Sequence, residues 1–232
     1  MSETDTALQA RLQQVRQRIA AYEQKYAREP HSVQLVAVSK TQAAERVRAV
    51  YSLGHRHFGE NYLQEALAKR EALADCNIVW HFIGPIQSNK TRDLAAGFDW
   101  IHSVDRLKIA ERLNEQRDPA RGPLRVLIQV NLSGEASKSG CTPEALPELA
   151  AAIARLPQLR LRGLMAIPAP ETDFDRQRQV FHQLRLARNA VMEAGLRDCR
   201  ELSMGMSADF EAAIAEGATL VRIGSDIFGK RP

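Results

Sequence analysis

Hydrophobic residues recur every three or four positions along the first part of the chain. They lie at Leu8, Leu12, Val15 and Ile19, with polar and charged residues between them. This spacing puts one apolar stripe on one face of a helix, so we predict an amphipathic helix from about Asp5 to Arg28, within residues 1–30. Pro30 lies just beyond it, where proline would stop a helix. We expect this helix to pack on the outside of the fold.

Short apolar runs then alternate with amphipathic segments. We predict eight strands, at residues 35–40, 57–61, 78–83, 100–104, 124–131, 159–165, 201–203 and 219–223. Strands alternating with helices are typical of parallel sheets, and eight repeats match a closed (β/α)8 TIM barrel. The predicted fold is therefore α/β, a single barrel domain over residues 1–232 with an additional N-terminal helix. A doubly wound open sheet is the alternative, although no Gly-x-Gly-x-x-Gly follows the first strand.

Composition narrows the classes of partner. The chain is 44% hydrophobic and 26% charged, which is ordinary for an α/β domain. Its net charge of +4 comes from 32 Lys and Arg against 28 Asp and Glu, spread along the chain. A nucleic-acid interface would cluster its basic residues, so an anionic small molecule is the better explanation, with a nucleic-acid or protein-binding module as an alternative. No apolar run reaches the length of a membrane helix, so we expect no membrane partner.

Cysteine and histidine spacing argues against metal and disulfide chemistry. Cys76, Cys141 and Cys199 are far apart and form no CxxC pair, which favours a reducing, cytoplasmic location. His55 and His57 form an H-x-H motif, but no nearby ligand set completes it. We therefore predict no metal site.

Lys40 is the first candidate for chemistry. It follows the apolar run Leu35–Ser39, and the two-residue period of a strand puts it on the same face as Val36 and Val38. The carboxyl ends of barrel strands carry reactive groups. Partial desolvation there would lower the pKa of the amine and allow it to form a Schiff base with a carbonyl. The alternative is a lysine that only extends from the strand end to water.

The ends of the seventh and eighth strands predict a phosphate site. Barrels often bind phosphate with these two loops. Ser203, Ser207 and Ser225 supply hydroxyl donors there, and Gly205 and Gly224 let the backbone come close to an oxyanion. Ordinary turns are the alternative explanation. A lysine and a phosphate site on the same rim imply a phosphorylated aldehyde or ketone, either a phosphosugar held by an aldolase or pyridoxal phosphate.

Arg222 helps to separate these two ligands. It shares a strand face with Leu220, so its guanidinium can point into the barrel mouth. There it would face a pyridine nitrogen and keep it unprotonated, which limits the ring as an electron sink. An ion pair with a neighbouring acid is the alternative.

Several motifs together resemble the pyridoxal phosphate homeostasis protein family. They occur in order from the first strand to the C-terminus, at residues 38–41 (VSKT), 57–62 (HFGENY), 80–90 (WHFIGPIQSNK), 163–168 (GLMAIP), 202–209 (LSMGMSAD) and 221–225 (VRIGS). The resemblance implies a barrel like the N-terminal domain of alanine racemase, with pyridoxal phosphate bound to Lys40 as a Schiff base. Ser225 stands where many relatives have threonine, which keeps the hydroxyl.

The resemblance also implies roles for other residues. Arg222 would face the ring nitrogen, and the phosphate would be held by Ser203, Ser207, Gly224 and Ser225. The ring pocket would be lined by Asn61, His81, Asn131 and Met165. The roles of Asp226, beside the phosphate site, and of Lys90 and Lys138, in rim loops, stay open.

The family is regarded as non-catalytic, so the resemblance implies a protein of intracellular pyridoxal phosphate homeostasis that works without strong turnover. Apoenzymes that use this cofactor would be its recipients. We expect no room after the eighth strand for the second domain of a racemase, and we expect a monomer. A weak pyridoxal phosphate-dependent amino-acid racemase is the alternative. It would need a second acid or base, for which His81 is the best candidate.

Overall fold

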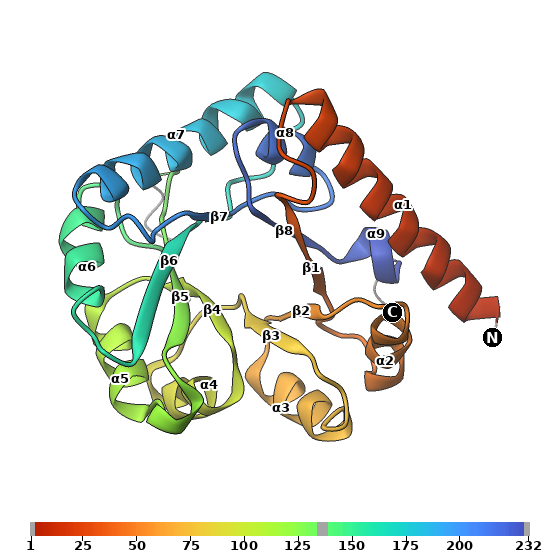
Figure 1. Cartoon of the computed structure of the whole chain (residues 1–232), viewed down its shortest axis with the longest axis horizontal. Helices are drawn as coiled ribbons and strands as arrows, with labels where there is room; N and C mark the ends of the chain where they lie inside the picture. Colours follow the sequence, from red (N-terminus) through yellow and green to blue (C-terminus); the bar gives the residue numbers. More distant parts are fainter. Residues whose placement is uncertain (1–2, 134–138, 230–232) are drawn as a thin grey trace.

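Eight parallel strands form a closed ring at the centre of the computed structural model, which describes residues 3–133 and 139–229 (Figure 1). They are β1 (Gln34–Val38), β2 (His57–Glu60), β3 (Val79–Phe82), β4 (Trp100–Val104), β5 (Leu124–Gln129), β6 (Leu159–Met165), β7 (Glu201–Ser203) and β8 (Leu220–Ile223). Each strand pairs with the next, and β8 pairs in parallel with β1. The predicted (β/α)8 barrel is therefore confirmed, and the open doubly wound sheet is wrong.

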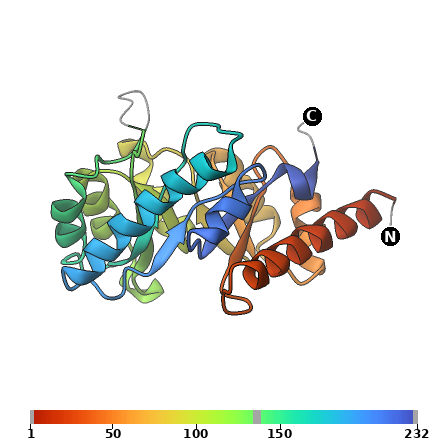
Figure 2. The same cartoon turned by 90° about the horizontal axis from the view of Figure 1, so that it is seen from above.

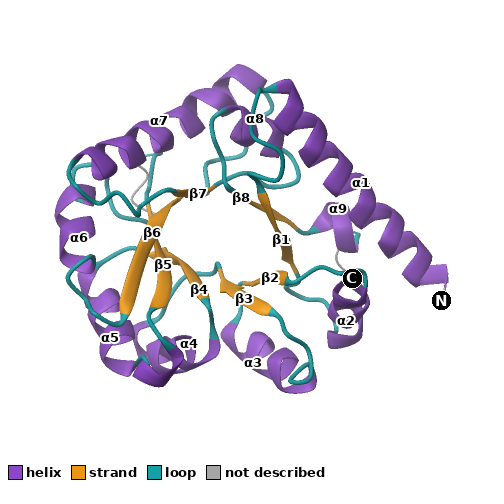
Figure 3. Ribbon diagram, viewed as in Figure 1, coloured by secondary structure: helices purple, strands orange, loops and turns teal. Residues whose placement is uncertain are grey.

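Helices surround this ring (Figure 3). They are α1 (Glu3–Lys25), α2 (Ala44–Ser52), α3 (Leu63–Ala72), α4 (Thr91–Gly97), α5 (Leu107–Gln116), α6 (Leu146–Ile153), α7 (Phe174–Glu193), α8 (Phe210–Ala215) and α9 (Ser225–Phe228), with the 3-10 turns η1 (Ser88–Lys90) and η2 (Pro119–Arg121). In the part of the chain described here, none of them is long and apolar enough to cross a bilayer.

The predicted N-terminal helix is present as α1, and Figure 2 shows it along the outside of the barrel. Its apolar stripe is buried against α2, α8 and α9. The helix ends at Lys25, three residues before the predicted end. Near the end of this helix, the buried carboxylate of Glu23 accepts hydrogen bonds from the backbone N–H groups of His31 and Val33. These bonds fix the chain as it enters β1.

The strands divide the apolar side chains into two cores, as their two-residue period requires. Inside the barrel lie Val36, Leu127, Met165 and Leu220. The larger core lies between the strands and the helices and includes Leu35 and Ala37. The predicted alternation is therefore present from Leu35 to Ala37. The strand ends at Val38, two residues before the predicted end, and Lys40 lies in the turn that follows.

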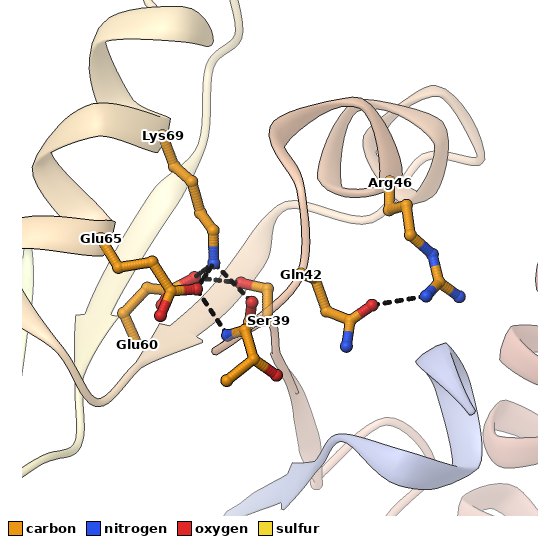
Figure 4. A network of polar contacts seen from close by, with 7 residues as sticks. Ser39, Gln42, Arg46, Glu60, Glu65 and Lys69 are labelled. Carbon is orange, nitrogen blue, oxygen red and sulfur yellow. Dashed lines mark hydrogen bonds and ion pairs between the residues drawn. The ribbon is translucent and has the colours of Figure 1, made fainter. Parts of the chain in front are cut away.

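A buried ion cluster fixes the backbone on both sides of Lys40 (Figure 4). Lys69 on α3 donates hydrogen bonds to the Ser39 carbonyl and to the carboxylates of Glu60 and Glu65. Glu65 also accepts the backbone N–H of Thr41, whose φ of +64° lies in the left-handed region. The Lys69 and Glu60 side chains are only 5% and 0% exposed. Burial raises the pKa of Glu60, and the Lys69 charge opposes that rise.

We predict that this cluster stabilises the loop as a unit. Lys69→Met leaves the buried Glu60 carboxylate without its cation, which should lower the free energy of unfolding by about 3–5 kcal/mol. Adding Glu60→Gln removes the uncompensated charge and should restore part of the loss. Chemical denaturation measures both. Lys25→Met is the control, because it removes an exposed ion pair with Glu211 and should change stability far less. Equal stability of the Lys69 and Lys25 variants would contradict this role.

Candidate functional site

A cavity of about 470 Å³ opens at the carboxyl ends of the first and last strands. That volume lies within the range of small-molecule sites. Six of the residues that the sequence singles out line it: Lys40, Asn61, Ser207, Arg222, Gly224 and Ser225. The fold therefore brings the candidate lysine, the candidate arginine and two of the candidate serines to one place.

The loops after β7 and β8 meet through their hydroxyl groups. Ser225 and Ser207 lie with their Oγ atoms 3.1 Å apart. The loop that carries Ser207 is fixed because Asp209 accepts the backbone N–H of Met206 at 2.6 Å. Gly224 leaves room beside this pair, because a Cβ there would lie 3.1 Å from the Val38 carbonyl oxygen of β1, a tight contact. Two adjacent hydroxyls and a bare backbone suit an oxyanion.

Arg222 reaches the cavity from inside the barrel and is only 3% exposed. It donates hydrogen bonds to Ser203 Oγ at 2.7 Å and to the Ala166 carbonyl at 2.9 Å. Both partners are neutral. The hydrogen bonds that hold the Arg222 guanidinium are therefore not the ion pair with an adjacent acid that was the alternative. Burial lowers the pKa of Arg222 to about 10, against the opposing charge of Asp209. The guanidinium is therefore still charged at neutral pH.

Asn61 lines the same cavity, and one of its polar atoms is unsatisfied. Its Oδ1 is buried and accepts no hydrogen bond from the described residues. Gly84 lets the chain after β3 pack directly on Asn61, because a Cβ there would lie 2.1 Å from the Asn61 carbonyl oxygen. A buried acceptor without a donor is costly, so this atom fits a ligand or a water molecule.

Four predicted site residues do not line the cavity. Ser203, His81 and Met165 are each 0% exposed and lie deeper in the barrel. Ser203 bonds to Arg222 instead of facing the rim, which leaves Ser207 and Ser225 as the candidate serines that line the cavity. Asn131 Oδ1 accepts hydrogen bonds from the backbone and hydroxyl of Ser133.

The cavity also has walls that sequence reasoning missed. They are Val38, Gln42, Ile83, Ile167, Met206, Ala208, Phe228 and Gly229. Gln42 accepts a hydrogen bond from Arg46, seen in Figure 4, and Arg46 also donates to the Phe228 carbonyl. Helix α9, which ends at Phe228, has four residues and leaves no periodic pattern from which to predict it.

The structure shows where two of the three charged residues with open roles lie. Asp226 turns away from the cavity and pairs with Arg18 of α1 at 2.8 Å. Lys90 lines a neighbouring cavity with Asn61 and Tyr62. Lys138 lies outside the described residues. Among the described residues, no three His, Cys, Asp or Glu side chains are grouped to hold a metal ion.

Comparison with known proteins agrees with the resemblance seen in the motifs. The family model for the N-terminal domain of alanine racemase matches residues 10–232. The pyridoxal phosphate homeostasis protein of Pseudomonas aeruginosa is 58% identical over 214 residues, which are 92% of this chain and 91% of that protein. The protein of the same name from Escherichia coli K12 is 51% identical over 227 residues, 95% of each chain.

A solved structure extends the comparison to three dimensions. PipY of Synechococcus elongatus, determined with pyridoxal phosphate bound, matches with a TM-score of 0.84 and 37% identity, over 96% of this chain and 100% of that one. The chain therefore resembles these relatives in sequence, and PipY in both sequence and fold, over nearly its whole length. The chain belongs to the pyridoxal phosphate homeostasis protein family, with a barrel of the alanine racemase N-terminal domain type.

Proposed function

We propose that the cavity binds pyridoxal phosphate, joined to Lys40 as a Schiff base, and that the protein acts in intracellular pyridoxal phosphate homeostasis without strong turnover. The observation that carries this proposal is the convergence of Lys40, Arg222 and the Ser207–Ser225 pair on one cavity. The pyridoxal phosphate bound to PipY and the names of the relatives support it. Apoenzymes that need the cofactor would be its recipients.

Each cavity residue has a distinct part in this proposal. Lys40 would hold the cofactor through its amine, which is the group that can form a Schiff base with an aldehyde. Ser207 and Ser225 donate hydrogen bonds to the phosphate, and Gly224 keeps the backbone close to it. Bound pyridoxal phosphate supplies an electrophilic carbonyl and an electron-withdrawing ring. Arg222, which is charged at neutral pH, would face the ring nitrogen, where it would disfavour ring protonation and so limit electron withdrawal.

The lining of the cavity favours a carrier over an enzyme. Racemisation by two bases needs a proton-exchanging group on each side of the ring. Among the described residues that line the cavity, Lys40 is the only side chain of the types that usually act as general bases. His81, the candidate second base, is buried away from it. A weak racemase remains the second candidate, because one base still permits slow proton exchange.

We predict that Lys40 is required for the cofactor's absorbance. Wild-type protein mixed with pyridoxal phosphate should develop a Schiff-base absorption band that borohydride removes. Lys40→Ala should lack the band, because no other amine lines the described part of the cavity. Lys90→Ala is the matched control, since Lys90 lies at the neighbouring cavity, and it should behave as the wild type. A band that persists in Lys40→Ala and is lost in Lys90→Ala would contradict the assignment of Lys40.

We predict that Ser207 and Ser225 contribute to binding only through the phosphate group. Ser207→Ala and Ser225→Ala each remove a hydrogen bond to a charged group, worth about 1.5–3 kcal/mol, so the Kd for pyridoxal phosphate should rise roughly tenfold or more. The Kd for pyridoxal, which lacks the phosphate, should not change. Equilibrium dialysis measures both ligands, with the exposed Ser133→Ala as control. Equal losses for the two ligands would contradict the phosphate site.

Turnover is tested by proton exchange at the α-carbon of amino acids. With pyridoxal phosphate bound, the wild type in deuterated water should exchange the α-proton of alanine only slowly, at a rate close to that of Lys40→Ala, because no second base in the described lining assists Lys40. NMR of the amino acid follows the exchange. Clearly faster exchange in the wild type would favour the weak racemase.

A further inference from the structure

A continuous file of hydrogen bonds crosses the inside of the barrel and ends at Arg222. His57 Nδ1 lies 3.0 Å from His81 Nε2, and His81 Nδ1 lies 2.9 Å from His102 Nε2. His102 Nδ1 lies 2.8 Å from Ser203 Oγ, the atom to which Arg222 donates. We call His57, His81 and His102 the histidine file. It follows the adjacent strands β2, β3 and β4 and then reaches across to β7 and β8.

The two ends of the file face different cavities. Arg222 lines the cavity that contains Lys40, at the carboxyl ends of the strands. His57 is the first residue of β2 and lines a second cavity of about 710 Å³, together with α1 and the start of β1. Because the strands are parallel, these cavities lie on opposite sides of the barrel. The file therefore connects the proposed cofactor site with the other face of the protein.

The inner part of the file is rigidly packed and neutral. His81 and His102 are each 0% exposed, and Trp100 stacks on His81 with ring centroids 5.7 Å apart and planes 10° apart. Burial lowers the pKa of both histidines well below its ordinary value, and the charge of Arg222 lowers that of His102 further. Both rings are thus uncharged at neutral pH, with one N–H each.

Hydrogen-bonding rules fix the order of donors in this neutral file. Arg222 can only donate, so Ser203 Oγ accepts from it and keeps one hydrogen to donate. That hydrogen goes to His102 Nδ1, so His102 carries its own hydrogen on Nε2 and donates it to His81 Nδ1. His81 then donates from Nε2 to His57 Nδ1. In the opposite order Ser203 would accept twice, and its hydrogen would need a third partner.

A proton on the outer ring reverses that order. With hydrogens on both nitrogens, His57 donates from Nδ1, so His81 Nε2 must accept. His81 then donates from Nδ1 to His102 Nε2, and His102 donates from Nδ1 to Ser203. His81, His102 and Ser203 keep the same number of hydrogens, and only their positions change. Ser203 Oγ now accepts from both His102 and Arg222, so its own hydrogen has lost its acceptor and the hydroxyl must reorient against Arg222.

Burial and the charged groups around His57 set the pH at which it takes up a proton. The titratable and charged groups around it are Arg125 of β5, Asp99 before β4 and the neighbours His55 and Arg56. The outer cavity adds Arg16 and Glu23 of α1, and His31. Burial and the charge of Arg125 lower the pKa of His57, and Asp99 opposes them. His57 is only half-buried, so it exchanges protons with solvent on acidification.

We propose that the histidine file is a positioning relay for Arg222, through which a proton taken up at His57 weakens the hold of Arg222 on the cofactor ring. His57, His81, His102 and Ser203 are positioning residues, because they act through Arg222 and do not line its cavity. The relay itself is a property of the hydrogen bonds. Its effect on the cofactor rests on the proposed function.

The relay is tested first without any cofactor. NMR of protein labelled with ¹⁵N-histidine reports which ring nitrogen carries hydrogen. At pH 8 we expect His81 and His102 to carry it on Nε2, and to move it to Nδ1 over the pH range in which His57 takes up a proton. In His57→Asn the amide oxygen accepts at every pH, so the move should be lost. His31→Asn, in the same outer cavity but outside the file, should behave as the wild type.

The same variants then test the link to the cofactor. With pyridoxal phosphate bound, the pH profile of the absorption band should contain a step at the His57 transition, which His57→Asn loses and His31→Asn keeps. Fixed tautomers in the wild type while His57 titrates would overturn the relay. Tautomer reversal with identical profiles in wild type and His57→Asn would overturn its effect on the cofactor. A missing band at all pH values would instead refute the proposed function and leave the NMR result standing.

Discussion

The pairing of the last strand with the first is the constraint on which the site depends. In this register Val36 of β1 lies opposite Arg222 of β8, and Ala37 lies opposite Ile223. The loops that leave these two strands therefore start side by side, although Lys40 and Ser225 are far apart in the sequence. Gly224 allows this close approach, because a Cβ there would meet the Val38 carbonyl oxygen.

Charges with low exposure surround this junction, and each is held by several partners. Lys69 contacts two carboxylates and a carbonyl below the Lys40 loop, and Arg222 contacts a hydroxyl and a carbonyl beside the cavity. Burying a charge is costly unless its hydrogen bonds are satisfied, so such groups have little freedom to move. The result is a cavity whose lysine loop and arginine are both held by residues that do not line it. Ligand binding then requires less ordering of the protein.

Much of this architecture could be predicted from the sequence, because it is encoded locally. Apolar runs and their spacing gave the eight strands, and the face of β1 indicated where Lys40 would lie. Their positions after the seventh and eighth strands indicated that Ser207, Gly224 and Ser225 belong to the candidate site, and all three line the cavity. What could not be predicted depends on contacts across the barrel. Ser203 looks like another rim hydroxyl in sequence, yet its place inside the barrel pairs it with His102, which is 101 residues away. The four-residue helix α9 is too short for periodicity to reveal.

We propose that Lys40 is the residue that carries the cofactor, and peptide mapping tests this assignment most directly. Wild-type protein incubated with pyridoxal phosphate is reduced with borohydride, digested and sequenced by mass spectrometry. We expect one pyridoxyl group per chain, on Lys40. Modification chiefly at Lys90 or another lysine, or no stable modification at all, would contradict it.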